Sequence, residues 1–552
     1  MTPSGSPREP SSQPTPDATR GPTAPPPPGT AREPTRTDRL LAALGGLLAG
    51  YVSLAVAELA AAAVRPEAGP VTAVGGAAID LTPAAVKNWA IVAFGESDKI
   101  VLLLGILVVL AVLAVALGLL ALRHRRAGAA GVLAFGVVGA LAAVSRPDSD
   151  SATDALPSLA GAVAGALLLY VLIGRLLGPR PSAAPEAAVG AARRSFLVVA
   201  AGSAVAATGA AALGRTLGGT RAQDAVASRT ALRLPPPASP APAVPPGAQL
   251  PVPGISPFTT PNRDFYRVDT ALVVPKVDAG GWRLRVHGLG VTRELRLTLD
   301  DLLGREVVER DITLACVSNE VGGPYVGNAR WLGVRLADLL REAGVTPPSA
   351  GGPADQLVAR SVDGMTIGTP VEQVMDGRDA LLAFGMNGEP LPFDHGFPVR
   401  MLVPGLYGYV SACKWIEEIE LTTFDSYDAY WVPRGWAAEA PVKTQSRIDT
   451  PRSFARPKPG AVMVAGVAWA QHRGIERVEV RIDEGPWRDA RLGTEDSRDT
   501  WRQWSYPWEA TSGRHTLTVR ATDGTGQVQT ERRTDTMPDG ASGWHSVVVT
   551  VD

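Results

Sequence analysis

The stretch TLACVSNEVGG, residues 313–323, combines an apolar strand, a cysteine at the end of that strand and a glycine-rich turn. Further along lie HGFPVR (residues 395–400) and the pair Lys414-Trp415. A lone cysteine at a strand end is most often a small core residue. With basic side chains and flexible backbone nearby, Cys316 could instead be a thiolate ligand, because positive surroundings favour the deprotonated form. The residues alone leave both roles open.

The residues around this stretch show both strand-like and helix-like patterns. Trp282, Leu284 and Val286 alternate with charged or imidazole side chains, which is typical of a half-buried strand. Apolar residues recur at helical spacing over residues 336–343, and Gly344 supplies a C-terminal stop. We therefore predict an α+β domain.

The C-terminal part of the chain has the pattern of an all-β domain. Short alternating runs at residues 478–482, 517–521 and 547–551 are separated by turn signals such as Asp523-Gly524. This spacing predicts a β-sandwich without an evident catalytic cluster. We expect its tryptophans to be core residues rather than a binding platform. They are Trp469, Trp487, Trp501, Trp504 and Trp508.

The first 217 residues are dominated by long apolar runs. Four of them cover residues 40–64, 100–122, 128–144 and 156–177, and a fifth, rich in alanine and glycine, covers residues 196–217. A membrane-spanning helix needs about 20 apolar residues, so three of the first four are long enough and the third is short. We predict a membrane domain of five transmembrane helices over residues 39–217.

Loop charges predict the orientation of these helices. Basic residues gather in the N-terminal tail, at residues 123–126 and at residues 175–194, whereas the loop after the third run carries Asp148, Asp150 and Asp154. The positive-inside rule places the N-terminus and both basic loops in the cytoplasm. Five spans then leave everything after Leu217 outside the cytoplasm, on a multi-pass protein of the cell membrane.

The fifth run begins with RRSFL, residues 193–197, which resembles a twin-arginine export signal inside the chain. The alternative is that the two arginines are only the positive anchor of an ordinary helix. The triplet AVA at residues 225–227 could be a cleavage site, but such triplets are common in alanine-rich chains. We favour an uncleaved anchor.

Composition narrows the remaining possibilities. The chain has 552 residues, a formal net charge of −1 and two cysteines. A nucleic-acid partner is not expected, because phosphate binding needs a basic surface. Two cysteines exclude a disulfide scaffold and a four-cysteine zinc site. Residues 1–38 predict a disordered proline-rich tail, and residues 218–257 predict an extended proline-rich linker that holds the next domain off the membrane.

Residues 258–552 resemble the sulfite oxidase superfamily of molybdopterin enzymes. The matching stretches, in order, are TPNRDFYRVDTALVVP, WRLRVHG, TLACVSNEVGG, WLGVRLADLL, MNGEPLPFDHGFPVRMLVPGLYG, KWIEEIEL and GASGWHSVVV. The resemblance implies an α+β molybdopterin domain over residues 258–445 and an immunoglobulin-like molybdenum-enzyme dimerisation domain over residues 446–552. The expected fold is therefore multi-domain, with all-α transmembrane helices, an α+β domain and an all-β sandwich.

The resemblance also implies roles for individual residues. Cys316 matches the thiolate ligand of molybdenum, and Arg267 matches a substrate-side arginine, so both are expected in catalysis. The implied contacts of the molybdopterin cofactor are Asn262, Phe265, Tyr266, His395, Arg400, Ala412, Cys413 and Lys414. The chemistry fits, because a guanidinium binds phosphate oxygens in a bidentate manner and an ammonium adds a point charge. We expect Cys413 to be packed rather than bound to the metal.

Several positions depart from the animal and plant sulfite oxidases. Their motif after the cysteine continues into paired arginines, where this chain has NEV at residues 319–321. Their active-site tyrosine aligns with Met365, and an arginine before their terminal Trp-His pair is missing from MPDGASGWH, residues 537–545. Each lost charge-assisted hydrogen bond is worth roughly 1.5–3 kcal/mol. We therefore expect poor sulfite binding and a less charged substrate, such as a sulfoxide or an N-oxide.

The sequence thus predicts a membrane-anchored, extracytoplasmic molybdopterin oxidoreductase that transfers an oxygen atom to or from a small molecule. Export of a folded, cofactor-loaded domain favours the twin-arginine interpretation. The alternatives are a true sulfite oxidase or dehydrogenase, a cofactor-free extracellular binding module, and a transporter or sensor that carries a vestigial enzyme. No haem site is evident, so a separate electron-transfer partner is expected. Membrane lipid is a further partner, and the C-terminal domain could pair two copies of the chain.

Overall fold

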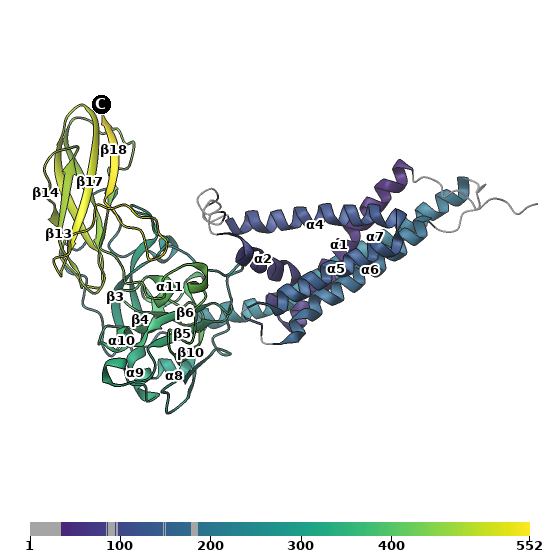
Figure 1. Ribbon diagram of the computed structural model, residues 1–552, viewed down its shortest axis with the longest axis horizontal. Coiled ribbons are helices and arrows are strands. Elements are labelled where there is room, and N and C mark those ends of the chain that lie inside the picture. The colour runs from purple at the N-terminus through teal and green to yellow at the C-terminus, as the bar shows by residue number, and fades with distance from the viewer. Residues whose placement is uncertain are drawn as a thin grey trace, which may run out of the picture.

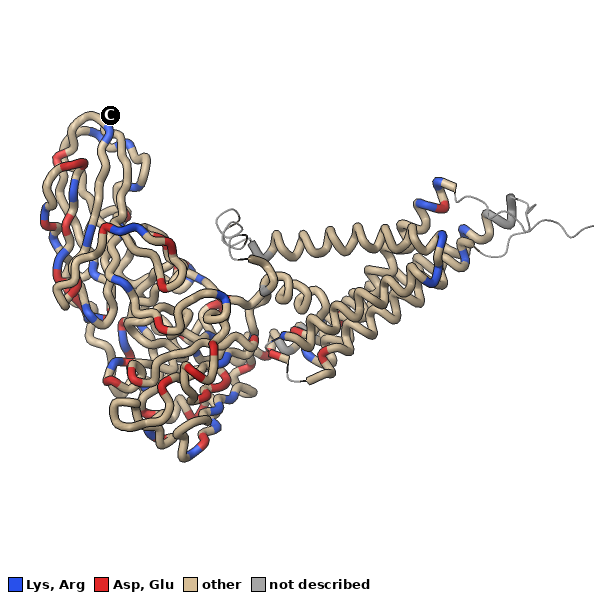
Figure 2. The backbone as a smooth tube through the Cα atoms, in the orientation of Figure 1, with Lys and Arg blue, Asp and Glu red and all other residues tan. Residues whose placement is uncertain are grey.

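The computed structural model describes residues 35–83, 86, 94, 98–146, 148–149, 151–177 and 186–552. An elongated helical half extends to one side, and two sheet-containing domains form the other end of the molecule (Figure 1). Most of the predicted tail, residues 1–34, lies outside the described residues. Charged residues crowd the sheet-containing domains and are confined to the ends of the helical half (Figure 2).

The helical half contains the five predicted apolar helices. They are α1 (Arg36–Val64), α4 (Asp98–Arg123), α5 (Arg125–Val144), α6 (Leu156–Leu177) and α7 (Glu186–Ala231). Each is long and apolar enough to cross a membrane. On α4, the side chains of Val108 and Val112 are 62% and 63% exposed, as expected of a surface that faces lipid.

Small residues allow these helices to pack closely. Gly46 of α1 faces Gly118 of α4, and a side chain at Gly46 would collide with the backbone carbonyl of Ala114. A side chain at Gly118 would likewise collide with the carbonyl of Ala42. Close backbone approach through small residues is typical of helix packing inside membranes.

The helices differ from the prediction in several respects. α1 begins at Arg36 rather than at residue 40, because the Thr35 hydroxyl accepts a hydrogen bond from the Asp38 N–H (3.2 Å) and caps the helix. α7 is far longer than the predicted run of residues 196–217. The short apolar helix α2 (Pro70–Leu81) was not predicted. The described residues of this half also include two 3-10 turns, η1 (Pro66–Ala68) and η3 (Ala152–Ala155).

The segment predicted to be a linker is packed rather than free. Its first residues, 218–231, continue helix α7. Beyond them, the Ala238 N–H donates to the Val307 carbonyl (2.8 Å), and the Leu250 N–H donates to Gln503 Oε1 (2.6 Å). The segment therefore runs along both sheet-containing domains and does not act as the predicted spacer.

The α+β domain contains two sheets. The first has the order β2 (Leu295–Thr298), β1 (Arg283–Gly288), β10 (Ile416–Thr422), β5 (Gln356–Ser361) and β6 (Thr366–Pro370). The second has the order β3 (Val308–Ala315), β4 (Val326–Arg335), β7 (Leu381–Met386) and β8 (Glu389–Pro390), with β9 (Arg400–Leu402) paired to β7. Only the β1–β10 pair is parallel among the paired strands described in these two sheets.

Short helices connect these strands. They are α8 (Leu299–Leu303), α9 (Leu336–Glu342), α10 (Val371–Met375) and α11 (Gly408–Ser411), together with the 3-10 turns η4 (Asn262–Asp264), η5 (Pro348–Ala350), η6 (Phe393–His395) and η7 (Val432–Arg434). The predicted strand at Leu284 and Val286 is confirmed, and both side chains are fully buried in β1. The predicted helix stop is confirmed too, because Gly344 adopts a φ of +81°.

The C-terminal domain consists of two four-stranded antiparallel sheets. One has the order β11 (Gln445–Thr450), β12 (Gly460–Trp469), β16 (Arg502–Ala510) and β15 (Arg491–Leu492). The other has the order β14 (Arg488–Asp489), β13 (Ile475–Ile482), β17 (Gly513–Asp523) and β18 (His545–Val551). Val464 and Trp504 of the first sheet share a core with Val480 and Val519 of the second.

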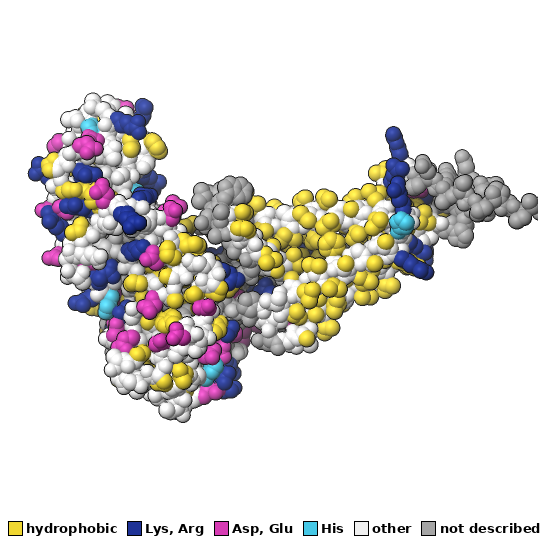
Figure 3. All heavy atoms as spheres, in the orientation of Figure 1, with side chains coloured by type: hydrophobic (Ala, Val, Ile, Leu, Met, Phe, Trp, Pro, Cys, Tyr) yellow, Lys and Arg dark blue, Asp and Glu magenta, His cyan; other side chains and the backbone are white. Residues whose placement is uncertain are grey.

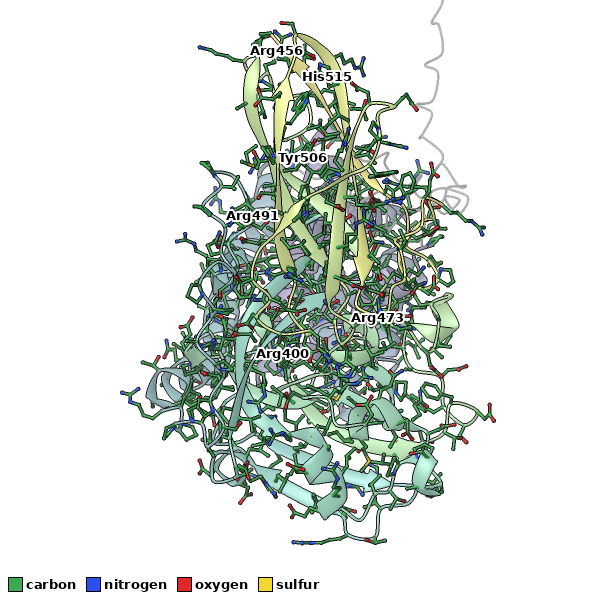
Figure 4. The ribbon with its side chains drawn as sticks, turned by 90° about the vertical axis from the view of Figure 1, so that its left-hand side faces the viewer. Arg400, Arg456, Arg473, Arg491, Tyr506 and His515 are labelled. Atoms are coloured by element: carbon green, nitrogen blue, oxygen red, sulfur yellow. The ribbon has the colours of Figure 1, made fainter. Side chains whose placement is uncertain are left out.

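Tryptophans of the C-terminal domain also join it to the α+β domain. Trp501 and Trp469 belong to the core of the α+β domain, and Trp501 Nε1 donates to the Phe258 carbonyl (2.9 Å). Trp487 differs from the prediction, because it is half-buried and its ring lies 4.9 Å from that of Trp544. Arg473 lies near the junction of the two domains in Figure 4 and donates to the Val442 carbonyl (2.9 Å).

Candidate active site

A cavity of about 400 Å³ lies between the α+β domain and the helical half. The α+β domain contributes Cys316, His395, Arg400 and Lys414 to its wall. The same domain also contributes Phe265, Tyr266, Asp363, Met365, Tyr409, Ala412, Tyr430, Trp431 and Trp436, and the helical half contributes Ile79, Thr82, Val86 and Leu102. The turn that carries Asp363 precedes β6, which lies on the side of its domain nearest the helices (Figure 1).

Cys316 follows directly after the buried strand β3. Its N–H donates to the Tyr325 carbonyl (2.9 Å), and Asn319 Oδ1 accepts from the Tyr325 N–H (2.8 Å), so the glycine-rich turn is closed on itself. Burial raises the pKa of the Cys316 thiol, while hydrogen bonds from Ser318 and the charge of Lys414 act in the opposite direction. Cys316 is 8% exposed and lies on the cavity wall, where a metal that displaces its proton can be bound by the thiolate.

His395 is held in one orientation by the segment around Asn262. Its Nε2–H donates to the Asn262 carbonyl (3.0 Å), and its ring lies edge-on to Phe265 at 5.5 Å between centroids. Burial lowers the pKa of His395 to about 4, and the charge of Arg400 adds to this effect. At neutral pH the imidazole is therefore uncharged, with Nε2 as the donor.

Arg400 is a buried cation with an incomplete set of partners. Its Nη1 donates to the His395 carbonyl (3.2 Å), and its guanidinium lies 5.1 Å from the centre of the Trp331 ring. Its Nε is buried and has no hydrogen-bond partner among the described residues. Burial lowers the pKa of Arg400 to about 10. A buried guanidinium with an unsatisfied donor is costly, so the site favours an anionic ligand.

The other cations near the cavity are matched by carboxylates. Lys414 Nζ lies 2.6 Å from Asp269 Oδ2, and Arg267 Nε lies 3.0 Å from the same oxygen. Arg267 also contacts Asp394 at 3.2 Å. Burial lowers the pKa of Lys414 to about 8, against the opposing effect of Asp269. Only Arg400 among these three cations lacks a carboxylate in the described ion pairs.

The structure brings together seven of the ten predicted site residues. Phe265, Tyr266, Cys316, His395, Arg400, Ala412 and Lys414 all line the cavity. Asn262 supports His395 from behind, and its own amide donates to the Met386 carbonyl (3.2 Å). Arg267 lies to one side in its ion pairs. Cys413 is 2% exposed and belongs to the domain core, which agrees with the packing role predicted for it.

Several lining residues were missed by the sequence analysis. Asp363 has its carboxylate bonded by the Met365 N–H (3.3 Å) and the Thr270 hydroxyl (3.4 Å), and burial raises the pKa of this carboxyl. A lone aspartate before a glycine reads as a turn residue, so nothing local marked it. Trp431 and Trp436 also line the cavity and were not singled out in the sequence. The contribution of α2 and α4 arises from contacts between distant parts of the chain.

The metal-ligating side chains at the cavity fit a metal whose other ligands come mainly from a cofactor. Among the described residues, no three His, Cys, Asp or Glu side chains are grouped closely enough to hold a metal ion. Cys316 is the cysteine on the cavity wall, and the unsatisfied Nε of Arg400 provides a binding point for an anion on the same wall. A chelating cofactor with an anionic group satisfies both features.

Comparison with known proteins agrees with this arrangement. Residues 271–431 match the family described as the oxidoreductase molybdopterin binding domain. Mitochondrial sulfite oxidase of Homo sapiens is 31% identical over 308 residues, which cover 48% of this chain and 55% of that protein. Nitrate reductase [NADH] 1 of Oryza sativa subsp. japonica is 36% identical over 196 residues, or 31% of this chain and 21% of that protein.

One solved structure covers a similar part of the chain. The sulfane dehydrogenase SoxCD from Paracoccus pantotrophus is 24% identical, with a TM-score of 0.47 over 54% of this chain and 84% of that chain. The chain spans about half the length of the sulfite oxidases it matches, as the 55% coverage of the human protein indicates.

Proposed function

We propose, from the premise that this chain carries a molybdopterin-binding domain of the sulfite oxidase superfamily, that it is a membrane-anchored molybdopterin-dependent oxidoreductase. Its reaction is the transfer of an oxygen atom to or from a small sulfur or N-oxide compound. The observation that carries the proposal is the presence of the Cys316 thiol and the incompletely paired Arg400 guanidinium on the wall of one cavity.

The residues around the cavity would hold the cofactor in a fixed orientation. Cys316 would bind the metal as a thiolate, and Arg400 would bind phosphate oxygens through its unsatisfied Nε and its remaining N–H groups. His395, neutral and fixed by Asn262, presents Nδ1 as an acceptor. Once bound, the cofactor would supply the two-electron oxygen-atom transfer itself.

Asp363 would supply a proton. Removal of an oxygen atom from a sulfoxide as water consumes two electrons and two protons. Burial raises the pKa of the Asp363 carboxyl above its usual value, and this carboxyl lies on the cavity wall, where we assign it the role of proton donor. Met365, which stands where the animal and plant sulfite oxidases have their active-site tyrosine, is only two residues after Asp363. A carboxylic acid can therefore take over hydrogen-bond donation to the substrate oxygen.

A substrate with little charge suits this site better than sulfite. The matched Arg267 is already paired with Asp269 and Asp394, so its charge is largely compensated. The loss of two further arginines should weaken sulfite binding by about 3–6 kcal/mol, or two to four decades. Neutral sulfoxides and N-oxides do not need these cations.

The distribution of charge supports an extracytoplasmic position for the sheet-containing domains. Basic side chains gather at the end of the helical half that lies away from those domains (Figure 3). At the opposite end, Arg65 pairs with Asp148 (3.0 Å) and Asp154 (2.6 Å). The positive-inside rule then puts the distal end in the cytoplasm.

For the C-terminal domain, the proposal is an immunoglobulin-like fold that pairs two copies of the chain.

The proposal is tested by assaying the purified full-length chain with two reactions in parallel. Reductant-driven reduction of sulfoxides and N-oxides should proceed, and ferricyanide-linked oxidation of micromolar sulfite should be slow. Cys316→Ser should abolish turnover, because a hydroxyl is a poorer ligand for a soft metal. Cys413→Ala is the matched control, since this cysteine lies in the core, and it should retain turnover. Full activity of Cys316→Ser would refute the proposal, and efficient sulfite oxidation would refute its substrate assignment.

A further inference from the structure

We propose that the cavity receives its substrate from the membrane surface, and that this substrate carries an apolar tail on a neutral, oxygen-bearing head. The tail would lie against helices α2 and α4, and the head would reach the wall that carries Cys316. This inference rests on the proposed function and names the substrate class and the route by which it arrives.

The helical half is a structural part of the cavity. Ile79 and Thr82 at the end of α2 and Leu102 near the start of α4 line it together with residues of the α+β domain. The contact between the two halves is close, because a side chain added at Gly75 of α2 would come within 2.7 Å of Leu272 Cδ2. Residues of the apolar helices therefore form part of the cavity wall.

An aromatic cluster forms another part of the wall. The rings of Tyr409 and Trp436 lie 5.6 Å apart, those of Trp431 and Trp436 lie 6.4 Å apart, and those of Tyr430 and Trp431 lie 5.0 Å apart. The hydroxyl of Tyr409 donates to the Ala437 carbonyl (2.7 Å), which leaves its ring face as apolar surface. Tyrosine and tryptophan are the residues that prefer the membrane–water interface. An aromatic cluster of this kind on the cavity wall supports a substrate that arrives from that interface.

The charges near the cavity disfavour an anionic head. Lys414 and Arg267 both contact Asp269, which neutralises much of their field. Asp363 adds a carboxyl on the cavity wall, and Arg400 is the cation left to bind the anionic group of the cofactor. A neutral sulfoxide or N-oxide oxygen can accept hydrogen bonds here without requiring an additional cation.

The hydrophobic effect predicts that binding affinity increases measurably with the length of the substrate's apolar tail. Burial of one methylene group contributes about 0.8 kcal/mol, so each added methylene should tighten binding up to about fourfold while the tail still contacts α2 and α4. A polar substrate that enters directly from water would show no such slope. Part of the apolar cavity wall is accessible to solvent, since Val268 of this wall is 45% exposed.

The experiment measures binding of a series of alkyl methyl sulfoxides, from dimethyl sulfoxide to methyl octyl sulfoxide, to the full-length holoprotein in lipid nanodiscs by calorimetry. Ile79→Ala and Leu102→Ala should each weaken binding of the octyl compound by about tenfold and leave dimethyl sulfoxide unaffected. The matched controls are Leu81→Ala on α2 and Leu104→Ala on α4, whose side chains are 85% and 58% exposed and do not line the cavity. Partition of the ligand into lipid is the same for all variants.

Equal effects of the lining and control substitutions would overturn the inference, as would affinity that is independent of tail length. An octyl compound that ends in a carboxylate is a further probe, and it should lose the gain from the tail because a charge would enter apolar surroundings. Molybdenum content and dimethyl sulfoxide turnover are measured on the same samples. Their loss would refute the proposed function, whereas normal values with no tail dependence would refute only the membrane route.

Discussion

Burial controls the protonation of the residues that face the cavity. It lowers the pKa of His395 and of Arg400, and it raises the pKa of Asp363 and of Cys316. Each shift moves the group toward its uncharged form, as expected where water is excluded. The site therefore offers a neutral imidazole and a carboxyl of raised pKa near a thiol that a metal would deprotonate. This combination suits proton-coupled oxygen-atom transfer.

The role of Asp363 gives a prediction on rate. Asp363→Asn should lower sulfoxide turnover by about 100-fold, because it removes a general acid, and it should leave dimethyl sulfoxide binding nearly unchanged. The wild-type rate should fall as pH rises through the raised pKa of Asp363, and the variant should lack this fall. Asp338→Asn, at an exposed ion pair with Arg341, is the control. Unchanged turnover of Asp363→Asn over all pH values would exclude the proton-donor role.

A second prediction concerns stability toward acid. Burial and the charges of Arg447 and Arg533 lower the pKa of His545 to about 4, whereas an unfolded histidine has a pKa near 6.5. Between these values the unfolded chain binds the proton and the folded chain does not, so the free energy of unfolding falls as pH falls from about 6.5 to about 4. This contribution is fully present above about pH 6.5.

His545→Gln should reduce the pH slope of stability in that window by up to one proton, or about 1.4 kcal/mol per pH unit. The Gln side chain can still accept the hydrogen bond that His545 Nδ1 now accepts from the Ile448 N–H (3.0 Å). Denaturant unfolding of the full chain, followed by tryptophan fluorescence at several pH values, measures the slope. Identical slopes for the two proteins would show that His545 does not titrate in this way.

The sequence identified residues that belong to ordered motifs and missed those that lack one. Cys316, His395 and Arg400 were predicted because they occur in several matched stretches, and all three line the cavity. Asp363 sits alone in a turn, so only the folded chain reveals that it faces the same space. The ion pair of Arg267 with Asp394 likewise could not be predicted from the sequence, since the two residues are far apart along the chain.

At the scale of elements, helix α7 connects the two halves of the molecule. It runs without a break from Glu186 to Ala231. Near its end, Arg229 Nε donates to the Leu391 carbonyl (2.7 Å) and Arg229 Nη2 donates to the Pro390 carbonyl (2.7 Å). The end of the helix is therefore fixed to the α+β domain.

The start of the same helix gives a prediction on export. Replacement of Arg193 and Arg194 by lysine keeps the positive charge, including the contact of residue 193 with Asp38, but removes the twin-arginine pattern. A reporter that is active only outside the cytoplasm, fused after Asp552, should then lose its signal. Lysine at Arg125 and Arg126 is the matched control and should preserve the signal. Normal export of the first variant would mean that α7 is an ordinary membrane helix.

Element types were more predictable than element limits. Apolar length predicted five helices, and residue alternation predicted β1, β13 and β17. The helical run of residues 218–231 was missed because the proline-rich residues after it dominated the composition of the segment. Helix α2 was missed because its apolar run is too short to suggest a membrane span.

At the scale of the whole molecule, the apolar helices contribute to the candidate site. They close a cavity that contains the candidate metal ligand, so the helical half and the α+β domain share one site. The order of the domains could be predicted from changes in composition along the chain. Their mutual contacts could not, because packing between residues such as Gly75 and Leu272 depends on surfaces formed only after folding.

The central claim is that this fold holds a molybdopterin cofactor through Cys316. The most direct measurement is the molybdenum and pterin content of the purified full-length chain, determined by elemental analysis and by fluorescence of the released pterin. We predict about one molybdenum and one pterin per chain, as expected for a single site. A folded chain that contains neither molybdenum nor pterin would contradict the account.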